Sequence, residues 1–159
     1  MGQSGYLKFA KSVSATTDQL IAGVNAIPGV QVLVAPHMTC LAISASTDVS
    51  NPVNILAVAD VMEDKMGGWK MERQQLPDTL HLSVLPQHAR TVDQFLQDLK
   101  NSVEYVQAHP ECANQGTTGV YGMVAKVPDK GIINDFITKF FSSLYTLEKG
   151  NSILETFGK

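Results

Sequence analysis

Two stretches of the sequence place polar or aromatic side chains where a ligand could meet them. In Leu85-Pro-Gln-His88-Ala-Arg90, an imidazole and a guanidinium lie between the end of a predicted strand and the start of a predicted helix. That position is common for contacts to anions. In Gly119-Val-Tyr121-Gly122-Met123, glycines flank an aromatic ring that could approach a ligand or another subunit. Spacing alone favours a capped loop for the first stretch and a turn with a packed tyrosine for the second.

Two further candidates lie within or beside predicted strands. His81 stands between Leu80 and Leu82 in an alternating apolar and polar run, so it points to the face opposite the leucines. A solvated or hydrogen-bonded strand histidine is the ordinary explanation. Trp69, with Met66 and Met71 around Gly67-Gly68, could line a pocket, although packing in the core or at an interface is the ordinary explanation.

Several kinds of site are not supported by the sequence. It contains neither a phosphate-binding loop nor a GxGxxG or GxSxG motif. The four histidines fall in separate elements without ligand spacing, so we predict no metal site. Cys40 and Cys112 form no disulfide framework, which favours free thiols in a reducing compartment.

Composition narrows the possible partners. The chain has 159 residues, 44% of them hydrophobic and 17% charged, with a net charge of −3. Its twelve Lys and Arg do not cluster, which argues against a nucleic-acid or anionic-membrane surface. The sequence has no apolar run of about 18 residues and no export signal at its start. We therefore expect a cytoplasmic, soluble protein.

The periodicity predicts an α+β architecture. A long helix is expected at about 6–26, strands at 30–34 and 40–45, a helix opened by Asn51-Pro52 to about 65, and a short strand at 69–73. A strand at 79–85, a helix capped by Thr91 to about 107, a loop at 109–119 and a helix at about 130–147 follow.

These elements predict a small, mainly antiparallel sheet covered on one face by helices. They are expected to form a single domain over 1–159, with a long junction helix at about 6–26. An α+β core would follow at about 27–109, and a C-terminal loop and helix at about 110–159.

Read in order, several short motifs resemble the C-terminal part of sphingosine-1-phosphate lyases, which are pyridoxal-phosphate enzymes of fold type I related to the group II amino-acid decarboxylases. The resemblance runs over about 5–146. It is carried by Gly5-Tyr6, Met66-Gly-Gly-Trp69 before Gln75-Leu-Pro77, Leu80-His81, His88-Ala-Arg90, Thr118-Gly-Val-Tyr-Gly-Met123 and Ser143-Leu-Tyr145.

The resemblance implies a parent enzyme that cleaves a C2–C3 bond of a phosphorylated sphingoid base to an aldehyde and phosphoethanolamine, with pyridoxal phosphate as electron sink. A large domain would bind that cofactor and supply the Schiff-base lysine. None of the ten lysines here follows a histidine, the usual setting of that lysine. We therefore expect no cofactor and no catalytic residue in this chain, which would begin at the junction between the domains and be inactive alone.

The resemblance also suggests roles for the candidates. Tyr121 and Gly122 would face the cleft, and His88 and Arg90 would lie near a phosphate. Many relatives have a strand reading Leu-Arg-x-Ser, whereas here Leu80-His81-Leu82-Ser83 lacks the bidentate guanidinium that suits a carboxylate. A phosphorylated sphingoid base has no carboxylate, so His81 fits a lyase and could face the cleft as well.

Two alternatives stay open: the small domain of a pyridoxal-phosphate-dependent amino-acid decarboxylase, and a stand-alone interaction domain without cofactor. The expected partner is the large cofactor-binding domain of the same enzyme. Without it, the helix at 6–26 should expose apolar surface, and we expect a homodimer or self-association.

Overall fold

A four-stranded sheet organises the first part of the chain, with strands in the order β1–β2–β4–β3. The strands are β1 (Val30–Val32), β2 (Cys40–Ala45), β3 (Glu72–Gln74) and β4 (Thr79–Ser83), and every neighbouring pair is antiparallel. The computed structural model describes residues 2–47, 52–119 and 130–145. These residues fall into two compact units, Met1–Val120 and Tyr121–Lys159, and each is described by itself.

The register gives the sheet two different faces. Residues directly opposite each other in antiparallel strands point to the same side. Leu41 pairs with Leu82 and Ile43 with Leu80, and three of these four side chains are buried. On the other side, Ala42 pairs with His81, and His81 pairs with Glu72. One face is therefore apolar, and the opposite face carries small and polar side chains.

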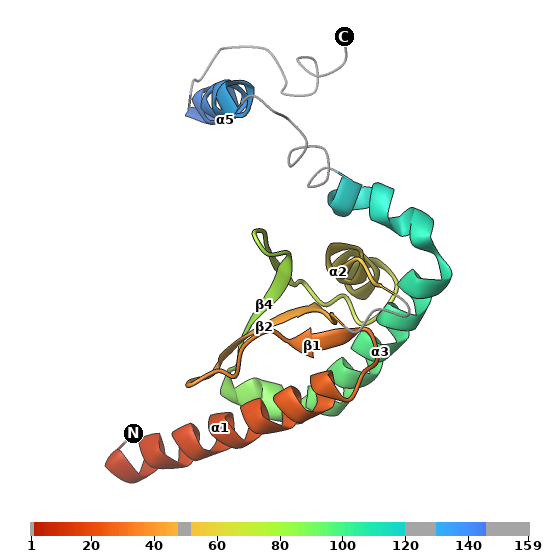
Figure 1. Ribbon diagram of the computed structural model, residues 1–159. Coiled ribbons are helices and arrows are strands. Elements are labelled where there is room, and N and C mark those ends of the chain that lie inside the picture. The colour runs from red at the N-terminus through yellow and green to blue at the C-terminus, as the bar shows by residue number, and fades with distance from the viewer. Residues whose placement is uncertain (1, 48–51, 120–129, 146–159) are drawn as a thin grey trace. The chain divides into compact units, whose positions relative to one another are not determined.

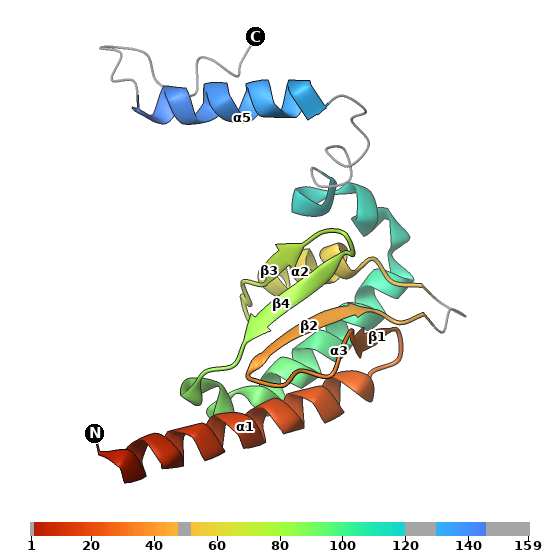
Figure 2. The ribbon, with the colours of Figure 1, turned by 60° about the vertical axis from the view of Figure 1, so that its left-hand side comes forward.

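Three helices pack on the apolar face: α1 (Gln3–Asn25), α2 (Ile55–Asp64) and α3 (Val92–Ala108) (Figures 1 and 2). Helix α2 contacts both the sheet and α3, which explains why most of its side chains are buried. The predicted α+β fold, a small antiparallel sheet covered on one face by helices, is confirmed.

Several predicted boundaries were wrong for local reasons. Helix α2 does not open at Asn51-Pro52: Asn54 is its N-cap, and its side chain accepts hydrogen bonds from the N–H groups of Leu56 and Ala57. Thr91 does not cap α3 with its side chain, because its hydroxyl donates to the carbonyl of His88 instead. That carbonyl belongs to η1 (Pro86–Arg90), a short 3₁₀ helix that periodicity did not predict.

Two other predictions need correction. The short strand expected at 69–73 is β3, at Glu72–Gln74, because Trp69 and Met71 lie against the helices before the pairing begins. The loop expected at 109–119 contains the 3₁₀ helix η2 (Pro110–Asn114) and a helical turn at 116–119. Its Pro, Asn and Gly residues suggested irregular backbone, but they begin and end these short helices.

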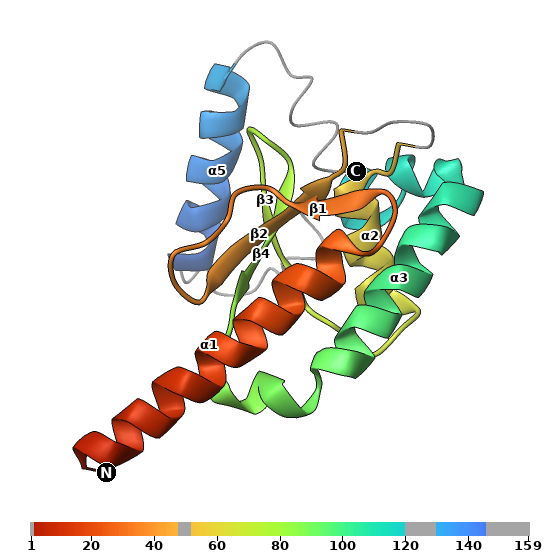
Figure 3. The same cartoon turned by 60° about the horizontal axis from the view of Figure 1, so that its bottom comes forward.

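Helix α1 corresponds to the long helix predicted at 6–26, whose role as a junction stays a prediction, and only its second half is packed. Its buried residues are Thr16, Thr17, Leu20 and Val24. Tyr6 and Phe9 continue the same face at helical spacing but are 68% and 44% exposed. Figure 3 shows this first half extending past the strands. We call Tyr6, Phe9, Ala10 and Val13 the α1 stripe.

The described part of the second unit is helix α5 (Lys130–Tyr145). Its exposed aromatic side chains stack along the helix: the rings of Phe136 and Phe140 are 6.4 Å apart. Neither α5 nor any other helix of the described residues has the length and apolarity needed to cross a membrane. The single-domain prediction for 1–159 stays a prediction.

Candidate functional site

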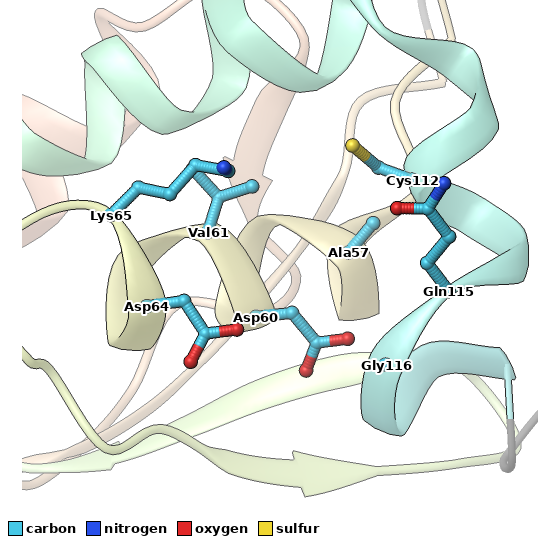
Figure 4. Close-up of a pocket in the computed structure, with 8 residues that line it drawn as sticks. All are labelled: Ala57, Asp60, Val61, Asp64, Lys65, Cys112, Gln115 and Gly116. Carbon is cyan, nitrogen blue, oxygen red and sulfur yellow. The ribbon is translucent and has the colours of Figure 1, made fainter.

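A cavity of about 230 Å³ lies between α2 and η2 (Figure 4). The carboxylates of Asp60 and Asp64 lie on one side of α2, and the side chains of Lys65 and Cys112 lie on the other. The cavity is lined by Ala57, Asp60, Val61, Asp64, Lys65, Cys112, Gln115 and Gly116. Its charged groups make it a natural first candidate for chemistry.

Asp60 is already fully engaged in structural contacts. Its Oδ1 pairs with the guanidinium of Arg73 on β3, and the two side chains are 16% and 10% exposed. Its Oδ2 accepts hydrogen bonds from Thr118, at 2.9 Å from the backbone N–H and 2.7 Å from the hydroxyl. A carboxylate with both oxygens occupied is poorly suited to act as a general base. We call Asp60, Arg73 and Thr118 the ionic hub.

The ionic hub fixes the turn that leads into the predicted Gly-Val-Tyr-Gly segment. Thr118 is 2% exposed, and Gly119 has no space for a side chain, because an added Cβ would lie 2.8 Å from the carbonyl oxygen of Asn114. Gly116 has a φ of +56° beside Asp60, a conformation that glycine adopts without strain. The candidates Tyr121 and Gly122 themselves lie outside the described residues.

His81 lies on the sheet face that points away from α1, α2 and α3. It is half-buried between Ala42 and Glu72, and within the described residues its imidazole ring forms no hydrogen bond. By the same register, Ser44 lies on this face, and its buried hydroxyl oxygen has no hydrogen-bond partner in the part of the chain that the structure describes. The open face therefore carries polar side chains that lack hydrogen-bond partners among the described residues.

His88 and Arg90 belong to η1 and do not join His81. The backbone N–H of Leu85 donates to Nδ1 of His88 at 3.1 Å, and the N–H of His88 donates to the carbonyl of Leu85. This reciprocal pair caps the start of η1, as the capped-loop interpretation predicted. Arg90 is exposed and forms no ion pair with the described residues. His88 lines a cavity with Leu82, on the helix-covered side of the sheet, so it and His81 lie on opposite sides.

Trp69 is positioned by a buried carboxylate that sequence reasoning missed. Asp98, 7% exposed, accepts hydrogen bonds from Nε1 of Trp69 at 2.8 Å and from the side-chain amide of Gln94 at 2.9 Å. The Trp69 ring also meets Phe95 edge-to-face, with centroids 5.3 Å apart. The sequence did contain one indication of this carboxylate: a single acidic residue on the otherwise apolar face of the helix at 91–107.

Metal-dependent and Schiff-base chemistry can each be compared with the described residues. In the ranges 2–47, 52–119 and 130–145, no three His, Cys, Asp or Glu side chains come together as metal ligands. A Schiff-base site needs a lysine in a cofactor cleft, but each lysine whose burial is described is exposed: Lys8, Lys11, Lys65, Lys70, Lys100 and Lys139. These residues do not fit pyridoxal phosphate.

Comparisons with known proteins give relatives over nearly the whole chain. No family model matches. The sphingosine-1-phosphate lyase of Arabidopsis thaliana is 33% identical over 145 residues, which is 91% of this chain and 25% of that protein. The lyase of Dictyostelium discoideum is 31% identical over 92% of this chain and 26% of its own length.

A solved structure agrees with these relatives. The sphingosine-1-phosphate lyase of Burkholderia pseudomallei superposes with a TM-score of 0.66 at 25% identity, over 92% of this chain and 27% of that one. The chain thus spans about a quarter of the length of the curated relatives it matches.

Proposed function

Because this chain is homologous to sphingosine-1-phosphate lyases over about a quarter of their length, we propose that it is the C-terminal small domain of such an enzyme. The parent would be a pyridoxal-phosphate-dependent carbon–carbon lyase that cleaves a phosphorylated sphingoid base to an aldehyde and phosphoethanolamine. The observation that carries the proposal is the alignment of 91% of the chain with 25% of a relative.

Two incomplete surfaces support a role within a larger protein. The α1 stripe leaves Tyr6 and Phe9 exposed beyond the packed half of the helix. Among the described residues, the open sheet face carries the His81 ring without a hydrogen bond and the buried Ser44 hydroxyl without one. An apolar stripe and unsatisfied polar groups are what a domain presents to a neighbouring domain. We propose that the large domain covers both.

The chain would contribute walls and positioning, whereas cofactor and catalytic lysine would belong to the large domain. His81, on the open face, is our strongest candidate for a wall of the cleft. Tyr121 and Gly122 remain proposed cleft residues, and the ionic hub fixes Thr118, three positions before Tyr121. His88 has a capping role in η1, so Arg90, exposed beside it, is the better candidate for a phosphate contact.

We also propose a cytoplasmic location and self-association of the isolated chain. Cys40 and Cys112 are both free thiols, which suits a reducing compartment. The α1 stripe is the surface through which two copies would pair in the absence of a large domain.

A chimera tests the proposal. We would replace the matching quarter of the Dictyostelium discoideum lyase with this chain and measure cleavage of sphingosine-1-phosphate. Retained cleavage is expected, and a folded, cofactor-loaded chimera without activity would contradict the lyase proposal. The isolated chain, incubated with pyridoxal phosphate and the same substrate, should give neither an imine absorbance nor product. Turnover by the chain alone would contradict the assignment of the cofactor site to the large domain.

A further inference from the structure

A second cavity, of about 120 Å³, lies on the helix-covered side of the sheet and is not used by the proposed function. Its apolar walls come from α1, β4, α3 and the segment before β3, and its polar groups are Lys70 of that segment, His88 of η1 and Thr91. The lining residues are Leu20, Trp69, Lys70, Met71, Leu82, His88, Thr91, Val92 and Phe95.

The aromatic wall of this cavity is fixed in one orientation. The hydrogen bond from Trp69 Nε1 to the buried Asp98 and the edge-to-face contact with Phe95, at an interplanar angle of 85°, both restrain the indole. Gly67 allows the backbone to pass close by, because an added Cβ would lie 2.5 Å from Trp69 Nε1. A restrained wall keeps the cavity open without a ligand, which lowers the cost of binding.

The polar groups around the cavity favour an oxygen-bearing, negatively charged head group. Since Nδ1 of His88 accepts the Leu85 N–H, a neutral His88 ring carries its proton on Nε2 and can donate it. Lys70 is exposed and adds a positive charge. Thr91 and Val92 place the N-terminus of α3 at the cavity, and the Thr91 side chain does not cap it. The one opposing charge in that first turn, Asp93, accepts a hydrogen bond from Gln19 at 2.9 Å.

The volume limits the apolar part of the ligand. A cavity of about 150 Å³ lined by Leu, Ile and Phe stays dry and binds benzene. A cavity of about 120 Å³ therefore accepts a short aliphatic end, not a whole lipid tail. We propose that this cavity binds the aliphatic end of a short-chain carboxylate, with the carboxylate at His88, Lys70 and the start of α3. The proposal is independent of the lyase assignment.

The only tryptophan of the chain is Trp69, so intrinsic fluorescence reports directly on the cavity. We would titrate the full chain with butanoate, pentanoate, hexanoate, heptanoate and octanoate at constant ionic strength. Affinity should rise about fourfold per methylene, which corresponds to about 0.8 kcal/mol, and stop rising once the cavity is full. Hexan-1-ol should bind more weakly than hexanoate, and hexylammonium more weakly still.

Matched variants separate the tail from the head group. Leu82→Phe fills the cavity and should weaken hexanoate at least tenfold. Lys70→Met should weaken hexanoate but not hexan-1-ol, whereas Lys100→Met, which alters an exposed lysine of α3 outside the cavity, should change neither. Far-ultraviolet circular dichroism checks folding. If Leu82→Phe fails to fold, the binding site is located by NMR in the unmodified protein instead. Hexanoate must then change the chemical shifts of Leu82 and Val92.

Three results would overturn the proposal: no saturable response to any carboxylate, no dependence on chain length, or hexylammonium binding as tightly as hexanoate. If Lys70→Met and Lys100→Met change the affinity for hexanoate equally, the cavity does not recognise an anionic head group. An apolar side chain of another protein would then be the better occupant of the cavity.

Discussion

Replacing Asp60 by alanine should strongly destabilise the first unit, because it breaks the ionic hub at its centre. The Arg73 side chain is only 10% exposed, and its Nε already lacks a hydrogen-bond partner within residues 2–47, 52–119 and 130–145. Its other contacts are the carbonyl of Met71 at 3.3 Å and the half-exposed Glu63 at 3.8 Å. Without Asp60, the guanidinium would stay buried with one weak acceptor and one distant carboxylate.

The magnitude follows from that geometry. Removing one partner of a buried ion pair costs roughly 3–5 kcal/mol, and the two hydrogen bonds of Thr118 to Asp60 are lost as well. We expect a loss of about 3–4 kcal/mol, because Glu63 can move closer to Arg73. At roughly 4 °C per kcal/mol for a domain of this size, the Tm should fall by about 12–16 °C.

A double-mutant cycle in urea, followed by circular dichroism, measures the coupling. Arg73→Met in the Asp60→Ala background should recover part of the lost stability, because no charge then remains buried. Glu63→Ala is the matched control: Glu63 lies farther from Arg73 and is 36% exposed, so its loss should cost below about 0.5 kcal/mol. If Asp60→Ala costs less than about 1 kcal/mol and adds simply to Arg73→Met, the ionic hub is not a structural unit.

Three other perturbations follow from single contacts. Gly119→Ala should lower the free energy of unfolding by about 1–3 kcal/mol, because the new methyl group would contact the Asn114 carbonyl oxygen. An unchanged midpoint in urea titrations would contradict this steric argument. Phe9→Glu places a charge in the α1 stripe and should abolish concentration-dependent self-association in light scattering, and persistent oligomers would move the interface elsewhere. A backbone hydrogen bond and then the one from His109 hold the pKa of Glu111 below its usual 4.5. The η2 segment therefore gains stability above that pH and loses it as the pH falls through the lowered pKa, and His109→Ala should raise the NMR titration midpoint of Glu111 partway back.

The α+β fold could be predicted because alternating and helical periodicities were clear in the strands and helices that form the core. In β4, Leu80 and Leu82 mark the helix-covered face and His81 the open one, as alternation required. Helix ends were less predictable because caps depend on competing local partners. Asn54 could not be distinguished from Asn51 as the cap of α2, and the Thr91 hydroxyl was already engaged by the His88 carbonyl.

The polar networks were not predictable, because they join residues far apart in the chain. Asp60 and Thr118 are separated by 58 positions, and Trp69 and Asp98 by 29. Nothing in the spacing of these residues indicates which carboxylate pairs with which donor. The resemblance did identify two segments that these networks hold, Met66-Gly-Gly-Trp69 and the start of Thr118-Gly119, but not the buried acids that hold them.

The positions of these acids separate folding from function in this chain. Asp60 and Asp98 accept hydrogen bonds from Arg73 and Trp69 on the helix-covered side of the sheet. His81 and Ser44 lie on the open face, where polar groups lack partners among the described residues. Substitutions of the acids should thus lower stability in the isolated chain and activity in a chimera together. His81→Ala should cost less stability than the substitutions of the acids, because the half-buried ring forms no hydrogen bond within the described residues, yet reduce chimera activity if this face meets the cleft. Equal activity of the His81→Ala and unmodified chimeras would make the open face a packing surface only.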